Sequence, residues 1–433
     1  MEMIFGRSAT SGAPVIWAPS ELANPHVGIF GDTGMGKSTL LRRFAEAMHS
    51  TGGRFRMHVV DGHGDLEMHG ESAVRFHESA DFGFNPLELN PDPEFGGVRK
   101  RIQSLITAMN RTAVRLGHRQ ERLLTKLLVG LYAERGFLIE DPSTWRQDAA
   151  NGKVYPTLLD AIAYGRERAK AMYIGADQRA MLAFKELNKA TKQLRAKQSA
   201  VRRSNDEGEE ARLQREIDGL REKAVDAYRE ALAFSDTGDE LDEILEFDGQ
   251  EETVKSVVDR LENLYAIGIY KSTPPPLDPG ARIWRYVITS LSQEEKKLFV
   301  MTRLETIFTR AVQRGIVDRV MDVVVIDEAH NYLDKDEDYI VNKMVREGRK
   351  FGISMFFASQ SPTDFVDIVL SSLGTKVTLG LDPNYWPAAM RKLGLSESAQ
   401  RFIIPRRRIL VQMKQVGQSA IGAHQVILPG AGE

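Results

Sequence analysis

The feature of the sequence that most constrains its fold is a glycine-rich run at residues 31–38, Gly-Asp-Thr-Gly-Met-Gly-Lys-Ser. The run matches the pattern G-x-x-x-x-G-K-[ST] at every defined position. It follows a short apolar stretch, residues 26–30, that we expect to be a buried strand, and it precedes a helix expected from Lys37 to Met48. A chance glycine turn is the alternative, but the flanking strand and helix favour a phosphate-binding loop. The run therefore predicts a nucleotide-binding α/β domain.

Each part of this loop (the P-loop below) has an expected role. Lys37 is expected to reach the β- and γ-phosphates of ATP, and the Ser38 hydroxyl to bind Mg²⁺. Backbone N–H groups that curl around phosphates, together with the positive end of the helix, supply the remaining contacts. The residues expected to bind the nucleotide in this way are Gly31, Thr33, Gly34, Met35, Gly36, Lys37, Ser38 and Thr39.

A second motif follows the fully apolar stretch at residues 323–326, which we expect to be a buried strand ending in Asp327 and Glu328. Asp327 is expected to hold Mg²⁺ through water, and Glu328 to polarise the water that attacks the γ-phosphate. An acidic pair after a strand is common in α/β proteins, so the pair indicates an ATPase only in combination with the P-loop. Neither a guanine-reading Asn-Lys-x-Asp run nor a Leu-Ser-Gly-Gly-Gln run is present. Together the two motifs predict an ATPase that uses Mg²⁺.

The pattern of elements indicates one core in two sequence pieces. Strand and helix signals alternate in residues 1–90 and again in residues 280–433, whereas helical periodicity dominates residues 91–279. Two apolar stripes interrupted by a polar, glycine-containing break predict an antiparallel helical hairpin at about residues 176–234. We therefore expect an α/β, RecA-like P-loop core with a mostly parallel sheet, interrupted by a large helical insertion. The first piece carries an N-terminal hairpin, and the second carries Asp327 and two closing strands.

Composition narrows the environment and the partners. The chain has no cysteine, which excludes disulfides and thiolate metal sites and is typical of a reducing cytoplasm. No apolar run is long enough to span a membrane, so we expect a soluble, cytoplasmic protein. The formal net charge is only −2, so any surface that binds nucleic acid must be local.

Beyond the two motifs, the sequence resembles the HerA/FtsK superfamily, which includes HerA-type DNA translocases and the ATPases of conjugation and type IV secretion. The resemblance covers about residues 24–89 and 286–414, and the helical insertion carries little of it. The runs that carry it are Asp61-Gly62-His63-Gly64, Asn85-Pro86-Leu87, Asp327-Glu328-Ala329-His330, the run from Arg346 to Gly352, and Ala358-Ser359-Gln360. It implies an ATP-driven motor that forms a homo-oligomeric ring, a hexamer in the family's manner, and acts on double-stranded DNA.

The resemblance also implies roles for individual residues. Arg349 matches the arginine that enters a neighbouring subunit's active site, with Arg346 as the near alternative, although either arginine could instead pair locally. Gln360 matches a residue that touches the γ-phosphate or the attacking water, and its alternative is a strand-end amide. Asp61 matches an acidic position that faces the nucleotide, but it could equally be a turn former before Gly62.

The sequence departs from the family's pattern at its N-terminus. The stretch before Asn24 is too short for the β-barrel of HerA proteins, and it lacks the membrane helices of coupling ATPases and the long N-terminal domain of secretion ATPases. We therefore expect a minimal motor without the family's usual docking module. Residues 406–408, Arg-Arg-Arg, are expected to be the polar start of a closing strand.

A basic stretch in the predicted hairpin leaves two interpretations open. Residues 188–203 contain no Asp or Glu, and the basic side chains could track phosphates or could be a solvated arm balanced by acidic residues on the returning helix. These basic residues are Lys185, Lys189, Lys192, Arg195, Lys197, Arg202 and Arg203. The function that the sequence predicts is translocation of double-stranded DNA, with a nuclease or another effector as a partner in DNA processing or phage defence. A conjugation or secretion ATPase and an ATP-switched scaffold are the alternatives.

Overall fold

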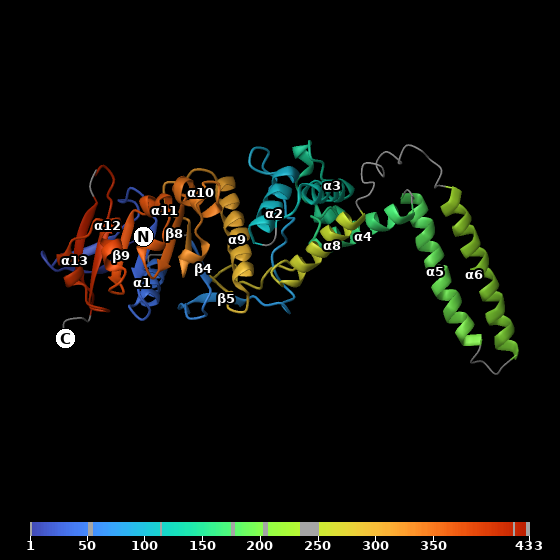
Figure 1. Cartoon of the computed structure of the whole chain (residues 1–433), viewed down its shortest axis with the longest axis horizontal. Coiled ribbons are helices and arrows are strands. Elements are labelled where there is room, and N and C mark those ends of the chain that lie inside the picture. Colours follow the sequence, from blue (N-terminus) through green and yellow to red (C-terminus); the bar gives the residue numbers. More distant parts are fainter. Residues whose placement is uncertain are drawn as a thin grey trace. The chain divides into compact units, whose positions relative to one another are not determined.

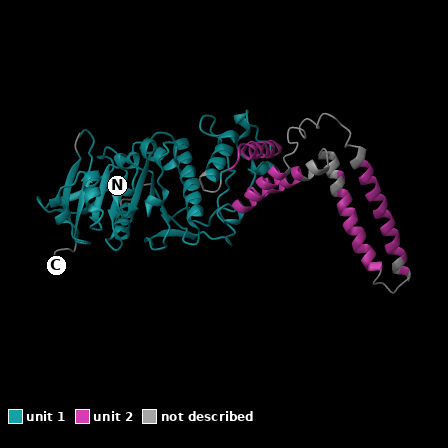
Figure 2. Ribbon diagram, viewed as in Figure 1, with its two compact units in different colours: residues 1–115, 136–157, 265–433 teal, residues 116–135, 158–264 magenta. Residues whose placement is uncertain are grey.

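The computed structural model describes residues 2–50, 55–112, 115–174, 178–201, 207–233, 251–418 and 421–429. The chain forms two compact units, shown in Figure 2. The core unit comprises residues 1–115, 136–157 and 265–433, and the helical unit comprises residues 116–135 and 158–264. The structure thus has a mostly parallel α/β core and a helical insertion, as the sequence predicts.

The core unit is built on one sheet of 11 strands in the order β2-β1-β11-β10-β9-β3-β8-β7-β4-β6-β5 (Figure 1). The seven strands from β9 to β5 run parallel to one another, and the four at the other side pair antiparallel. Their bounds are β1 Met3–Ser8, β2 Pro14–Trp17, β3 Val27–Gly31, β4 Arg56–Asp61, β5 Glu71–Arg75, β6 Ile283–Val287, β7 Asp322–Ile326, β8 Ile353–Ser359, β9 Thr375–Gly380, β10 Arg408–Met413 and β11 Gly422–Ile427.

The central strands are buried on both faces. Every residue of β3, β8 and β9 is buried, and four of the five residues of β7 are buried. The mostly apolar runs of β3, β7 and β8 are typical of parallel strands that are covered by helices on both sides. The rings of Trp17, Phe44 and Phe356 pack edge to face at 4.8 to 5.5 Å and join strand and helix layers on one side of the sheet.

The helices of the core unit connect the strands. Helix α9 shows how local sequence sets an element's start: Ser292 accepts a hydrogen bond from the Glu295 N–H, and the Ser292 N–H donates to the Glu295 carboxylate at 2.7 Å. This reciprocal pair satisfies N–H groups that the first helical turn leaves free. The helices are α1 Lys37–Ser50, α2 Val98–Thr112, α9 Gln293–Arg314, α10 Ile340–Glu347, α11 Asp367–Ser372, α12 Trp386–Leu393 and α13 Glu397–Phe402.

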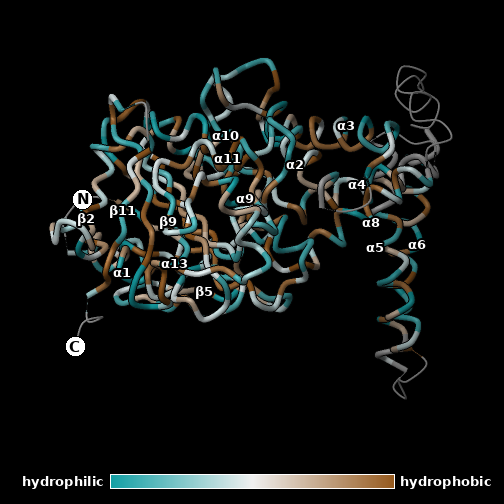
Figure 3. The backbone as a smooth tube through the Cα atoms, turned by 60° about the vertical axis from the view of Figure 1, so that its left-hand side comes forward, coloured by the Kyte–Doolittle hydropathy of each residue, from teal (hydrophilic) through white to brown (hydrophobic). Residues whose placement is uncertain are grey.

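The helical unit contains α3 (His118–Glu134), α4 (Leu158–Ile174), α5 (Gln178–Val201), α6 (Glu207–Ala233) and α8 (Glu251–Ala266). Helices α5 and α6 pack against each other as the predicted hairpin, and hydrophilic and hydrophobic residues alternate along both (Figure 3). The buried Ile217 and Ala227 belong to the apolar stripe, and Lys197 bonds Glu216 across the pair at 2.5 Å. Arg202, Arg203 and the Lys185 side chain lie outside the described residues.

The boundaries of the two compact units differ from those of the segments expected from the sequence, 1–90, 91–279 and 280–433. Residues 91–115, 136–157 and 265–279 belong to the core unit. The reason lies in tertiary packing, because α2 packs along α9 of the core, while Ser104 of α2 donates a hydrogen bond to Glu305 of α9. No helix within the described ranges is both long and apolar enough to cross a bilayer.

Candidate nucleotide-binding site

The P-loop connects the end of β3 to the start of α1. Gly34 and Gly36 have φ of 79° and 100°, in the left-handed region that favours glycine. The Asp32 N–H donates to the Gly380 carbonyl at 2.8 Å, and the Thr33 N–H donates to the Asp32 carboxylate at 2.7 Å. These bonds fix the start of the loop against the end of β9.

Lys37 is the first residue of α1, and its ammonium lies inside the loop. The side chain is largely buried, donates to the Gly31 carbonyl at 2.8 Å, and lies 3.9 Å from a carboxylate oxygen of Glu328. The two sequence motifs, almost 300 residues apart, therefore meet at one ammonium group. This meeting follows from the sheet order, because β8 alone separates β3 from β7.

Asp327 directly follows the apolar strand β7, and the residue is 8% exposed. Burial, and then the negative charge of Glu328, raise the pKa of Asp327 from 3.8 to about 6. The positive charge of Lys37 acts in the opposite direction, and Asp65 adds to the rise. The site thus concentrates negative charge that a cation would neutralise.

Glu328 has an unusual backbone conformation. Its φ of 47° and ψ of 47° lie in the left-handed region, which costs a non-glycine residue on the order of 1 kcal/mol. This turn directs the carboxylate to Lys37 on one side and to the His330 imidazole, at 3.4 Å, on the other. A strained residue at the end of a buried strand is typical of functional sites, and it agrees with the predicted role of Glu328.

Asp65 is a site residue that the sequence motifs did not single out. The Ser38 hydroxyl donates to the Asp65 carboxylate at 3.5 Å, and Arg42 of α1 donates to the carbonyls of Asp65 and Glu67. The available signal was an acidic residue four positions after Asp61, at the carboxyl edge of the same sheet. Ser38, Asp65 and Asp327 provide hydroxyl and carboxylate oxygens, the ligand types that suit Mg²⁺. The residues present therefore fit this ion.

Asp61 makes its contacts within the loop that follows β4 and with Arg285. Its fully buried carboxylate accepts hydrogen bonds from the N–H groups of His63, Gly64 and Leu66 at 2.6 to 3.2 Å, and from Arg285 at 2.9 Å. Four donors use the lone pairs of both oxygens. These contacts favour the turn-forming alternative, in which Asp61 shapes the loop that carries Asp65, and the contact with the nucleotide stays a prediction.

Gln360 directly follows β8, whose last residue, Ser359, is in register with Phe30 of β3. Since β8 lies between β3 and β7, the Gln360 backbone lies at the carboxyl edge of the sheet, between the P-loop and Asp327. This location is compatible with the predicted contact to the γ-phosphate, which stays a prediction.

Arg349 lies near the amino ends of the parallel strands, whereas Lys37 lies near their carboxyl ends. It belongs to the short helix η4 (Gly348–Phe351) that precedes β8, and its guanidinium donates to the Ala23 carbonyl, ahead of β3. At a rise of about 3.3 Å per residue, the length of β3 alone separates this carbonyl from the P-loop by roughly 13 Å. Arg346 instead donates to the Glu337 carbonyl at 2.8 Å and pairs with its carboxylate at 3.4 Å. Neither arginine reaches the nucleotide site of its own subunit.

Arg406 is a second residue that the sequence did not assign to the site. It precedes β10, has a positive φ of 61°, and donates from Nε to the Gly34 carbonyl at 3.0 Å. The guanidinium thus rests on the P-loop from a segment 372 residues away in sequence. A run of three arginines gave no signal that one of them contacts the loop.

Comparison with known sequences identifies relatives of both core pieces. Residues 4–93 match the central domain of helicase HerA, and residues 295–402 match the HerA-like C-terminal domain. The DNA double-strand break repair helicase HerA of Saccharolobus solfataricus is 38% identical over 61 residues, which cover 13% of this chain and 12% of that protein. HerA of Sulfurisphaera tokodaii is 31% identical over 100 residues, 21% of this chain and 20% of that protein. These matches thus span a fifth or less of the relatives' length.

Comparison with solved structures extends the similarity to the fold of nearly the whole chain. VirB4 of Thermoanaerobacter pseudethanolicus aligns with a TM-score of 0.64 at 15% identity, covering 99% of this chain and 96% of that one. The plasmid coupling protein TrwB in complex with ADP and Mg²⁺ aligns with a TM-score of 0.52 at 12% identity, covering 98% and 89%.

Proposed function

Because the chain is a P-loop ATPase of the HerA/FtsK superfamily, we propose that it hydrolyses ATP in a closed ring, of six identical subunits, and moves double-stranded DNA. The observation that carries the ring is the position of Arg349. It lies away from the P-loop of its own subunit, so any nucleotide that it contacts would belong to a neighbour. A guanidinium supplied in this way neutralises charge on the transferred phosphoryl group.

The chemistry within one subunit follows from the contacts described above. Lys37 binds the β- and γ-phosphates, and in doing so exchanges its bond to the Gly31 carbonyl for bonds to phosphate oxygens. Glu328, freed from the Lys37 ammonium, accepts a hydrogen bond from the attacking water, which Gln360 helps to orient. Ser38, Asp65 and Asp327 would hold Mg²⁺, which when bound offsets negative charge on the phosphates.

Mixed rings test whether Arg349 acts on a neighbour. Arg349→Ala and Glu328→Gln should each depress ATP turnover by a factor on the order of a thousand while leaving ATP binding intact. Mixing the two inactive proteins should restore part of the activity, because some interfaces then combine an intact Glu328 with an intact Arg349. Arg391→Ala, at an exposed position of α12, is the control and should retain wild-type turnover. No recovery on mixing, or full activity in a monomeric fraction, would refute the shared site.

Duplex DNA should stimulate ATP turnover if the ring is a translocase. The net charge of −2 does not favour binding by the molecule as a whole, so the contact must be local. Charge reversal at Lys189, Lys192 and Arg195 of α5 tests the hairpin: lost DNA binding with unchanged basal turnover would place the contact there. Unchanged binding would assign the basic arm to assembly or to a partner, such as a nuclease. Affinity should fall steeply with salt in either case.

A second candidate is an ATPase of a conjugation or secretion machine. The observation that favours it is the fold similarity to VirB4, which covers 99% of the chain and includes the helical unit. The two functions differ in their response to DNA. If duplex DNA at low salt neither binds nor changes ATP turnover, the translocase proposal fails and the secretion ATPase takes its place.

A further inference from the structure

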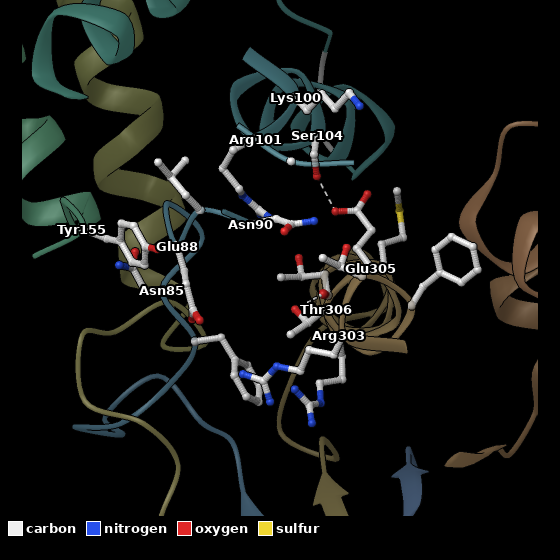
Figure 4. A pocket seen from close by; sticks show the side chains of 18 of the residues that line it. Asn85, Glu88, Asn90, Lys100, Arg101, Ser104, Tyr155, Arg303, Glu305 and Thr306 are labelled. Atoms are coloured by element: carbon white, nitrogen blue, oxygen red, sulfur yellow. Dashed lines mark hydrogen bonds between the residues drawn. The ribbon is translucent and has the colours of Figure 1, made fainter. Parts of the chain in front are cut away.

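The core unit contains a large pocket away from the nucleotide site. Its volume is about 990 Å³, and its wall is formed by α2, α9, the segment 83–97 and residues 272–279 (Figure 4). This volume is at the upper end of the range typical of small-molecule sites. Five cationic side chains and three carboxylates line the wall, so the lining carries a net positive charge. The pocket is therefore suited to an anion.

Arg303 of α9 is the central cation of this wall. The side chain is 3% exposed, yet its one hydrogen bond within the described residues goes from Nε to the neutral Tyr286 hydroxyl, at 2.9 Å. The rings of Phe84 and Tyr286 each lie 5.0 Å from the guanidinium carbon. No carboxylate of the described residues lies within 4.0 Å of it. A buried guanidinium without a counter-ion is costly, because burial removes its hydration.

Two further arginines surround the same tyrosine. Arg310 follows two helical turns after Arg303 and lines the pocket, and no hydrogen bond or ion pair joins it to another described residue. Arg56 stacks on Trp284 at 3.8 Å, and its buried Nη1 has no hydrogen-bond partner among the described residues. Burial raises the pKa of Tyr286, and the charges of Arg303, Arg310 and Arg56 each oppose that rise, which places all three within electrostatic reach.

Two of the carboxylates nearby, Asp322 and Glu305, are engaged by other partners. Asp322, the acid that also interacts with Arg56, forms its ion pair with Arg314 at 2.8 Å and a contact with His58 at 3.5 Å. Glu305 accepts a hydrogen bond from Ser104, on another part of the wall than Arg303 in Figure 4. Within the described part of the chain, Arg303 and Arg310 thus keep positive charge that no ion pair neutralises.

We propose that this pocket is a second anion site, in which Arg303 and Arg310 bind the phosphate group of a nucleotide-sized ligand. Two guanidinium groups match phosphate oxygens in charge and in hydrogen-bond geometry. The rings of Phe84 and Trp284 provide apolar surface for the remainder of the ligand. The phosphate could belong to a free nucleotide or to a nucleic-acid strand, since both present the same group.

Calorimetric titration tests the site in the full chain. The Lys37→Ala background weakens phosphate binding at the P-loop and so separates this pocket from the proposed ATPase function. Inorganic pyrophosphate and ADP are the probes for a free ligand, and a short single-stranded oligonucleotide is the probe for a strand. In this background Arg310→Gln should weaken binding of at least one probe class by about tenfold, the loss expected for one charge-assisted contact. Arg99→Gln, at an exposed α2 position that does not line the pocket, should leave it unchanged.

The pattern of losses identifies the source of the phosphate. Weaker binding of pyrophosphate and ADP alone assigns the pocket to a free nucleotide, and weaker binding of the oligonucleotide alone assigns it to a strand. Arg310 is exposed to the pocket, so its substitution leaves folding intact, whereas Arg303→Gln is a second variant whose fold is checked by circular dichroism. The proposal is overturned if Arg310→Gln binds all three probes as Arg99→Gln does.

Discussion

The pKa of Asp327 makes a stability prediction that is independent of any activity. A carboxyl whose pKa is about 6 in the folded protein and 3.8 when unfolded binds its proton more tightly in the folded state. The charged form therefore costs stability, and the cost grows as pH rises from about 4 and is complete above 6. Asp327→Asn keeps the shape and removes the charge. We expect this variant to be more stable than the wild type in the absence of Mg²⁺, although it loses hydrolysis.

The magnitude follows from the shift of about two pKa units. At 1.36 kcal/mol per unit, the gain from Asp327→Asn should be about 3 kcal/mol at pH 8 and about half of that at pH 5. The rise comes first from burial and then from Glu328, so Glu328→Gln should reduce the gain in a double variant. Both residues lie at the carboxyl edge of β7, and their effects should not be additive.

Urea unfolding at pH 5 and pH 8, in EDTA, measures both values. Because the chain has two compact units, the signal should report the core unit, for example through the buried Trp17. Asp318→Asn, at an exposed position, is the control and should change the free energy of unfolding by less than about 0.5 kcal/mol. A destabilised Asp327→Asn protein at pH 8, or a gain that does not shrink at pH 5, would refute the electrostatic reasoning.

Three other substitutions test the remaining parts of the site. Lys37→Ala should weaken ATP binding by at least about tenfold in a fluorescent-nucleotide titration, because the phosphates lose their buried ammonium contact. Glu328→Gln should bind ATP with near-normal affinity in the same titration but turn it over about a thousandfold more slowly, and near-normal turnover would remove Glu328 from its assigned role. Arg285→Met should cost about 3 kcal/mol or more in thermal unfolding, since it leaves the fully buried Asp61 carboxylate without its cation. Arg282→Met, at a half-buried neighbouring position where the guanidinium bonds a backbone carbonyl and no buried carboxylate, should unfold close to the wild-type temperature.

The P-loop and the end of β7 were predictable from sequence because each is a local pattern. A glycine run between a strand and a helix, and an acidic pair after four apolar residues, carry their structural context with them. The parallel core followed from the same signals, since most of its buried strands, such as β3, β7 and β8, are mainly apolar. Local patterns of this kind do not depend on knowing which strands are neighbours.

Asp65 and Arg406 were not predictable because their place depends on tertiary contacts. Asp65 reaches Ser38 only since Asp61 and Arg42 hold the loop after β4 in one shape. Arg406 lies just before β10. Because β10 runs antiparallel to β9, it begins where the parallel strands end, next to the P-loop, and there Arg406 bonds the Gly34 carbonyl. The resemblance pointed to Asp61 and so to the correct loop. The carboxylate oxygen beside the Ser38 hydroxyl, however, belongs to Asp65, four positions later.

In the ring proposed above, strand β3 would join two places that belong to different active sites. Its last residue opens the P-loop, while the segment just before it provides the Ala23 carbonyl that Arg349 binds and the His26 imidazole. His26 contacts the Val345 carbonyl at 3.1 Å and accepts from the Met355 N–H at 3.0 Å, on both sides of the turn that carries Arg349. A β-strand paired on both edges bends little, so it would act as a rigid lever. In such a ring, phosphate release at one interface would shift the arginine at the next, and the subunits would hydrolyse ATP one after another.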